Sequence, residues 1–113
     1  MTDRTLVSRH CVACEGGVAA LSESAILDRL QHLPEWKLLS DGRAIEREFR
    51  FENYATTLAF ANAVAWLAVR ENHHPVLEIH YGHCRVRYTT DAIGGLSDND
   101  FICGAKVDAL LEL

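Results

Sequence analysis

The chain has 113 residues, of which 49% are apolar and 24% are charged, and its formal net charge is −5. This length fits one domain, and its apolar content can supply a core that needs neither disulfides nor a metal. The acidic balance argues against nucleic-acid binding, and the composition excludes disordered and fibrous classes. The longest apolar stretch, residues 58–69, is too short to span a bilayer, so we expect no membrane contact.

The sequence divides into an arm and a domain. Residues 1–21 carry small and flexible residues and predict an irregular N-terminal arm, whereas residues 22–113 carry the periodic apolar patterns of a folded domain. The arm contains charges but no apolar stretch of signal-peptide length. We therefore expect a cytoplasmic protein with reduced cysteines.

A capped helix is predicted at the start of the domain. Ser22 is a favoured N-cap residue, apolar side chains recur after it at helical spacing, and Pro34 stops the helix. A hairpin is expected next, with a short strand over residues 36–39, a turn at residues 40–42 and a second strand over residues 45–51.

A long apolar helix is predicted from Tyr54 to about Asn72. Asn53 precedes it, and Pro75 prevents its continuation. One face is expected to be buried, and the side chains along or beside that face are Leu58, Ala61, Ala65 and Ala68, with Phe60, Val64 and Leu67.

Two alternating segments, residues 76–81 and 85–91, flank a turn at Gly82 and predict a second hairpin. The last helix is expected after Ser97, which forms a capping-box pattern with Asp100. The order is helix, two strands, helix, two strands, helix. We predict an α+β fold in which a four-stranded antiparallel sheet carries three helices on one face.

The arm contains a Cys-x-x-Cys pair. His10, Cys11 and Cys14 are the candidates for a zinc site, which His83 or Cys84 could extend. A closed structural site needs four ligands, and the sequence has no second Cys-x-x-Cys pair. A redox motif and an arm with incidental thiols are the alternatives. We expect no metal and no cofactor.

Two adjacent histidines, His73 and His74, lie between the long helix and Pro75. Turns are more often built from Asn, Asp, Gly and Ser, so a histidine pair is unusual there. Imidazoles titrate near neutral pH and are suited to proton transfer. A surface pair without chemistry is the alternative, and metal binding is less favoured because neighbouring side chains in an extended segment diverge.

The segments His73-His74-Pro75 and Gly95-Leu96-Ser97-x-x-Asp100, with Tyr81 six residues after the proline, resemble the signature of the pterin-4a-carbinolamine dehydratase family. The resemblance extends from the helix at Ser22 to the C-terminus. It implies an α+β fold, a homo-oligomer that is a dimer or a tetramer, and a pterin as a candidate ligand. It also implies dehydration of a 4a-carbinolamine to a quinonoid dihydropterin.

The resemblance carries the family's catalytic residues onto His73, His74 and Asp100, whereas the family's third histidine falls on Asp91. Aspartate has a reference pKa of about 3.9, against about 6.5 for histidine, and is poorly matched to proton donation at neutral pH. We also expect Asp91 to share a strand face with Arg85 and Arg87. Dehydratase activity is therefore expected to be weak or lost. The alternative is a working enzyme in which the histidine pair suffices and Asp91 orients one of its members.

The altered third histidine makes the chain similar to a branch of the family that is associated with α-carboxysomes. Its pterin-dehydratase-like proteins are thought to help to assemble Rubisco. The resemblance implies an assembly factor, or chaperone, whose oligomer presents repeated surfaces to Rubisco subunits. Such a cytoplasmic protein would associate with the carboxysome. An active 4a-hydroxytetrahydrobiopterin dehydratase is the alternative.

Overall fold

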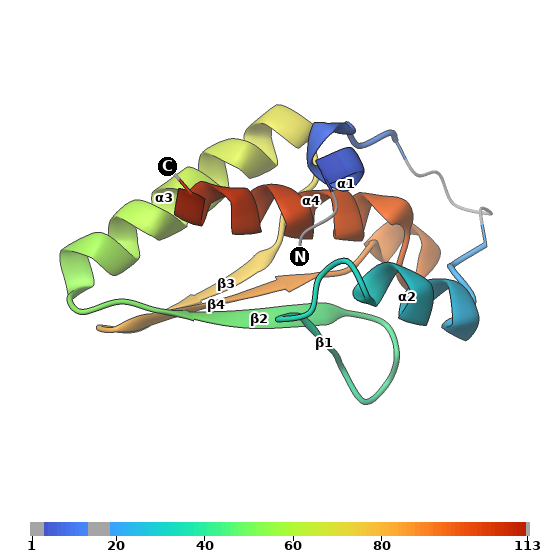
Figure 1. Ribbon diagram of the computed structural model, residues 1–113, viewed down its shortest axis with the longest axis horizontal. Helices are drawn as coiled ribbons and strands as arrows, with labels where there is room; N and C mark the ends of the chain where they lie inside the picture. Colours follow the sequence, from blue (N-terminus) through green and yellow to red (C-terminus); the bar gives the residue numbers. More distant parts are fainter. Residues whose placement is uncertain (1–3, 14–18, 113) are drawn as a thin grey trace.

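The computed structural model describes residues 4–13 and 19–112, in which helices cover a four-stranded antiparallel sheet (Figure 1). The strands pair in the order β1-β2-β4-β3 and are β1 (Lys37–Leu38), β2 (Ile45–Arg50), β3 (Val76–Ile79) and β4 (His83–Tyr88). The helical elements are α1 (Arg4–Ser8), α2 (Glu23–Leu30), α3 (Tyr54–Glu71), η1 (Asp91–Ile93), α4 (Asp98–Ala109) and η2 (Leu110–Glu112). The predicted α+β class and four-stranded antiparallel sheet are confirmed.

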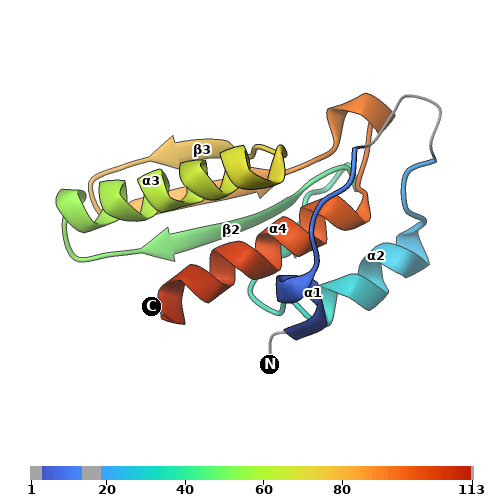
Figure 2. The ribbon, with the colours of Figure 1, turned by 90° about the horizontal axis from the view of Figure 1, so that it is seen from above.

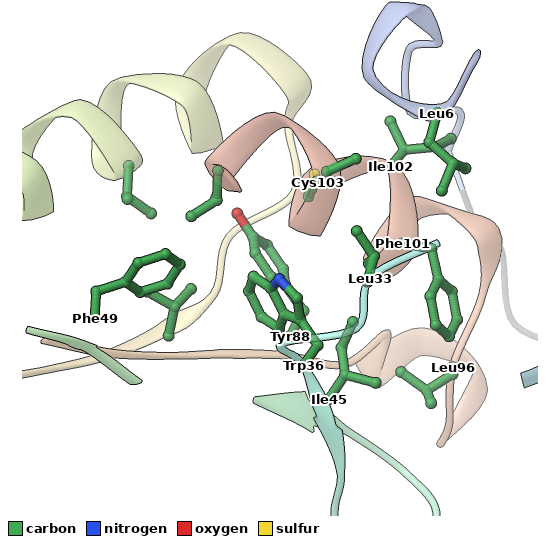
Figure 3. Close-up of a cluster of buried hydrophobic side chains, with 14 of the residues drawn as sticks. Leu6, Leu33, Trp36, Ile45, Phe49, Tyr88, Leu96, Phe101, Ile102 and Cys103 are labelled. Carbon is green, nitrogen blue, oxygen red and sulfur yellow. The ribbon is translucent and has the colours of Figure 1, made fainter. Parts of the chain in front are cut away.

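The helices α3 and α4 lie over the same face of the sheet, and Figure 2 shows them side by side. Side chains of β2 and β4 alternate between this face and the open one. Those that point to the helices and form the core include Ile45, Phe49, Cys84, Val86 and Tyr88, as Figure 3 shows for three of them. The long helices are thereby held over the strands that lead to the site.

The arm contains the short helix α1, although the sequence predicts an irregular segment there. Leu6 is buried in the core cluster, and Lys106 on α4 donates a hydrogen bond to the carbonyl oxygen of Val7. A helix of five residues is not stable by itself. Its contacts with α4 stabilise it, and these are not visible in the local sequence.

The predicted N-cap of α2 is confirmed, and the structure adds an N-cap for α3. Ser22 Oγ accepts a hydrogen bond from the amide of Ala25, and Asn53 Oδ1 accepts one from the amide of Thr56. The α3 helix ends at Glu71, and its C-cap Asn72 adopts a left-handed conformation with φ of 51°. Asparagine tolerates that conformation better than most residues, so the chain turns here toward the histidine pair.

The predicted buried face of α3 is partly wrong. Leu58 and Ala65 are exposed, whereas the buried side chains are Thr57, Phe60, Ala61, Val64 and Ala68. The helix is apolar on several sides, so periodicity does not define one face uniquely. Packing decides the orientation, because the Phe60 ring lies 4.6 Å from Phe49 and 5.0 Å from Phe51.

The strand β4 ends at Tyr88, three residues before its predicted end. Thr90 pairs with Gly95 and closes a loop, in which Asp91 begins the η1 turn. The expected face shared by Asp91 and the arginines of β4 is therefore wrong. Those arginines lie on the open face of the sheet, where Arg85 forms ion pairs with Glu46, Glu48 and Glu78, and Arg87 with Glu46.

No helix in residues 4–13 and 19–112 combines the length and the apolar character that crossing a membrane requires.

Candidate active site

The centre of the site is a hydrogen bond between two residues that the sequence singled out. His73 Nε2 lies 2.6 Å from Asp100 Oδ1, although 27 residues separate them in the chain. Asp100 is completely buried, and the side chain of His73 is only 13% exposed. Water therefore has little access to this bond, which strengthens it.

Asp100 has two further donors, which hold its carboxylate in place. Asp100 Oδ2 accepts from the hydroxyl of Thr90 at 2.8 Å and from the backbone amide of Ser97 at 2.9 Å. The Ser97 contact is half of the capping box at the start of α4, so the predicted box is confirmed. An ionised carboxylate only accepts hydrogen bonds. His73 therefore donates from Nε2, and its Nδ1 is the ring atom that remains to take up a proton.

Both the ring and the backbone of His73 are held by neighbouring residues. It stacks on the Tyr88 ring at 5.6 Å with an interplanar angle of 10°, and its backbone amide bonds to the carbonyl oxygen of Ala68. Tyr88 is buried at the end of β4. Burial is the main cause that raises the pKa of Tyr88, so the tyrosine stays neutral and acts as a wall.

A cavity of about 330 Å³ brings the predicted residues together. His73 and His74 line it from the end of α3, and Asp91 lines it from the η1 turn. His74 and Asp91 are exposed. Asp100 does not line the cavity but lies behind His73. His73, His74 and Asp91 thus line one cavity, and Asp100 positions the ring of His73.

The N-terminal arm forms another wall of this cavity through Cys11, Val12 and Ala13. Glu71, the last residue of α3, accepts hydrogen bonds from the amide of Cys11 at 2.8 Å and from His10 Nδ1 at 2.9 Å. Burial alone would raise the pKa of Glu71, but the bonds from the arm and the charge of nearby Lys106 lower it overall. An ionised Glu71 therefore anchors the arm.

The zinc candidates of the arm have other partners in the structure. His10 bonds to Glu71, and Cys11 Sγ lies 3.3 Å from Cys103 Sγ. Cys14 lies outside the described residues. Within residues 4–13 and 19–112, no group of three or more His, Cys, Asp or Glu side chains is arranged to hold a metal ion.

Four residues of the site were not assigned roles by sequence reasoning. Thr90 bonds to Asp100, Glu71 and Asn99 hold the arm, and Cys103 contacts Cys11. The one available signal was helical spacing, because Asn99 and Cys103 are four residues apart on α4 and share a face. Their partners lie about 90 residues away, so the contacts follow from tertiary structure alone.

Residues 19–110 match the family described as pterin 4 alpha carbinolamine dehydratase. A relative from Nitrosomonas eutropha, named a putative pterin-4-alpha-carbinolamine dehydratase, is 53% identical over 106 residues, which cover 94% of this chain and 93% of the relative. The family match and the relative cover nearly the same part of the chain. The chain belongs to the pterin 4 alpha carbinolamine dehydratase family.

Two solved structures share the fold. A transcriptional coactivator/pterin dehydratase from Brucella melitensis matches with a TM-score of 0.77 and 27% identity, over 80% of this chain and 97% of that one. A pterin dehydratase-like protein, described as a RuBisCO assembly factor in the alpha-carboxysome, matches with a TM-score of 0.59 and 23% identity, over 67% and 88%. At this identity, the match to the second structure shows a shared fold and nothing more.

Proposed function

We propose that this protein removes water from a pterin 4a-carbinolamine. The observation that carries the proposal is the cavity itself, in which His73, His74 and Asp91 meet and the buried Asp100 fixes the ring of His73. The high identity to relatives that bear the dehydratase name supports it. Sequence reasoning favoured an assembly factor, but the arrangement of the pocket gives more support to its alternative, the enzyme.

The reaction requires two proton transfers. A base takes a proton from a ring nitrogen, a carbon–nitrogen double bond forms, and the 4a-hydroxyl group leaves as water after an acid protonates it. His73 is suited to be the base, because its bond to Asp100 leaves Nδ1 to accept a proton and compensates the positive charge that develops on the ring. His74, next to it, is the candidate acid.

Asp91 has a positioning role in this proposal. It lies at the family's third-histidine position and lines the cavity as an exposed carboxylate. A carboxylate can accept hydrogen bonds from substrate N–H groups or from His74 but is a poor proton donor at neutral pH. We therefore expect catalysis by the histidine pair at a lower rate than in a three-histidine site.

Substitution of each histidine tests the assignment. His74→Ala and His73→Gln should each lower the rate of carbinolamine dehydration by about 10²–10⁴-fold, the usual contribution of one acid or base. His80→Ala is the matched control, because His80 is an exposed histidine at the turn between β3 and β4. If all three variants dehydrate the carbinolamine as fast as the unaltered protein, the pair is not the acid and base.

Assembly of Rubisco stays a second candidate. Asp91 at the third-histidine position is the feature that favours it, since an incomplete acid–base set suggests a fold retained for binding. Co-expression with Rubisco subunits tests it. A higher yield of assembled Rubisco, unchanged by His74→Ala, would support a role that does not depend on the cavity, and no change in yield would remove this candidate.

A further inference from the structure

The thiols of Cys11 and Cys103 lie in contact beside the cavity, with 3.3 Å between their sulfur atoms. Cys11 belongs to the arm and is half-buried, whereas Cys103 is completely buried on α4 (Figure 3). A disulfide bond is about 2.05 Å long, so the two sulfur atoms would need to approach by about 1.25 Å. The two proton transfers of the proposed dehydration use neither thiol.

Hydrogen bonds on both sides of Cys11 hold it at this position. Its own amide donates to Glu71 Oε1 at 2.8 Å. The next residue, Val12, donates to Asn99 Oδ1 at 3.0 Å, and Asn99 Nδ2 donates back to the carbonyl oxygen of Val12 at 2.6 Å. Asn99 lies one helical turn before Cys103, so the same face of α4 holds both the arm's backbone and its thiol partner.

We propose that Cys11 and Cys103 form a reversible disulfide that links the arm to α4. The oxidant is a hydroperoxide. The Cys11 thiolate attacks the peroxide, the O–O bond breaks, and an alcohol or water leaves as Cys11 becomes a sulfenic acid. Cys103 then attacks that sulfur, the S–S bond forms, and water leaves. The two thiols lose two electrons and two protons in total, which the peroxide takes up.

The different burial of the two thiols sets the order of these steps. Cys11 is partly accessible to a small oxidant, and Cys103 is not. A buried thiol in contact with an accessible one is placed to resolve its sulfenic acid before further oxidation to a sulfinic acid. A thiol such as dithiothreitol should reverse the link.

The link would fix one wall of the cavity, because Cys11, Val12 and Ala13 line the same cavity as the histidine pair. This consequence rests on the proposed dehydratase function. An arm that must move to admit a pterin cannot do so once it is bonded to α4, and such gating steps limit turnover in many enzymes. We expect hydrogen peroxide to lower the dehydration rate severalfold and dithiothreitol to restore it.

Peptide mapping of the full chain identifies the link. After treatment with hydrogen peroxide, alkylation and trypsin digestion without reductant, the expected product joins residues 10–29 to residues 88–106. The first peptide contains both Cys11 and Cys14, so the Cys14→Ser variant decides which of them is linked. The product should persist in Cys14→Ser and in the control Cys84→Ala, and it should be absent from Cys11→Ser and Cys103→Ala.

Two results would overturn the proposed disulfide between Cys11 and Cys103. One is a disulfide within the first peptide, between Cys11 and Cys14, and the other is a sulfinic acid at Cys11 without any link. Thermal unfolding of each variant shows whether it is folded. If Cys103→Ala does not fold, because Cys103 is completely buried, Cys11→Ser still tests the link. If the link forms but the rate stays unchanged, the consequence for the cavity is wrong. If the reduced protein has no dehydratase activity, the proposed function fails while the peptide map still decides the link.

Discussion

Asp100 illustrates how one residue serves both fold and site. It is the third residue of α4, where its carboxylate accepts from the amide of Ser97, and it also receives hydrogen bonds from Thr90 and His73. A buried carboxylate is tolerated only when such partners replace water. The capping interaction therefore holds the carboxylate in position to bond to His73.

Removal of one partner should have a measurable cost. Thr90→Val keeps the shape of the side chain but deletes the hydroxyl group that donates to Asp100. A buried acceptor that loses a donor costs about 1–3 kcal/mol, so the free energy of unfolding in urea should fall by that amount. Thr56→Val, at an exposed position of α3, is the control. Equal losses in the two variants would show that the Thr90 bond contributes nothing.

The carboxylate at position 91 should limit the rate. Asp91→His introduces the residue type that the family resemblance places at this position, and it adds a group that titrates near neutral pH. We expect the dehydration rate to rise by about tenfold or more, within the range that one added acid or base supplies. Asp28→His, an exposed position of α2, should leave the rate unchanged. No gain in Asp91→His, with pterin binding retained, would mean that Asp91 is not the limiting feature.

At the scale of the elements, one charged residue of α3 contributes to holding the arm. Glu71 accepts from the amide of Cys11 and from His10, and its pKa is lowered by these bonds and by Lys106 against the opposing effect of burial. Because the folded-state pKa lies below that of the unfolded chain, this stabilisation is complete above the ordinary glutamate pKa of about 4.3. It is lost as the pH falls through the lowered value.

The protection of the Cys11 and Val12 amides against hydrogen exchange, corrected for the intrinsic pH dependence of exchange, should therefore fall on acidification below about pH 4.3. Glu71→Gln should lower the protection at both positions already at neutral pH. The uncharged side-chain amide of glutamine forms weaker hydrogen bonds with the arm than the glutamate carboxylate does. Glu52→Gln, an exposed position before α3, serves as the control. A protection factor at Cys11 that changes neither with pH nor in Glu71→Gln would contradict the anchoring role.

The elements that local chemistry specifies could be predicted from the sequence. Ser22 and Asn53 cap α2 and α3, and Ser97 with Asp100 caps α4. The helix α1 could not be predicted, because contacts with α4 stabilise it. The end of β4 was placed too late, since the bridge between Thr90 and Gly95 depends on the loop as a whole.

The site was predictable only in part, for a similar reason. The adjacent histidines are visible in the sequence, and the resemblance supplied Asp91 and Asp100 as their partners. The contact of Glu71 with Cys11 joins residues 60 apart, and the contact of Cys11 with Cys103 joins residues 92 apart. No local pattern encodes such contacts, so the arm's place at the cavity emerged only from the fold.

For the whole molecule, we expect a homo-oligomer, and α3 offers a surface for it. The exposed apolar side chains of this surface, which we call the α3 stripe, are Tyr54, Leu58, Trp66 and Val69. Adjacent β3 is an edge strand of the sheet and exposes Val76 and Ile79. Exposed apolar patches of this kind commonly mark contacts between subunits.

Trp66→Glu should therefore weaken the oligomer. The Trp66 side chain is 64% exposed, and a charge there would have to be desolvated at a subunit contact. Light scattering during gel filtration should show a shift toward the 12.6 kDa chain mass. Leu27→Glu, on exposed α2 surface, should leave the mass unchanged. A Trp66→Glu protein with the mass of the unaltered protein would exclude the α3 stripe as the contact.

The rate of dehydration of a freshly generated pterin 4a-carbinolamine, with and without this protein, tests the central claim most directly. The account predicts a rate above that of buffer, proportional to protein concentration and lost in His74→Ala. A rate equal to that of buffer, with a three-histidine family member active in the same solution, would contradict it.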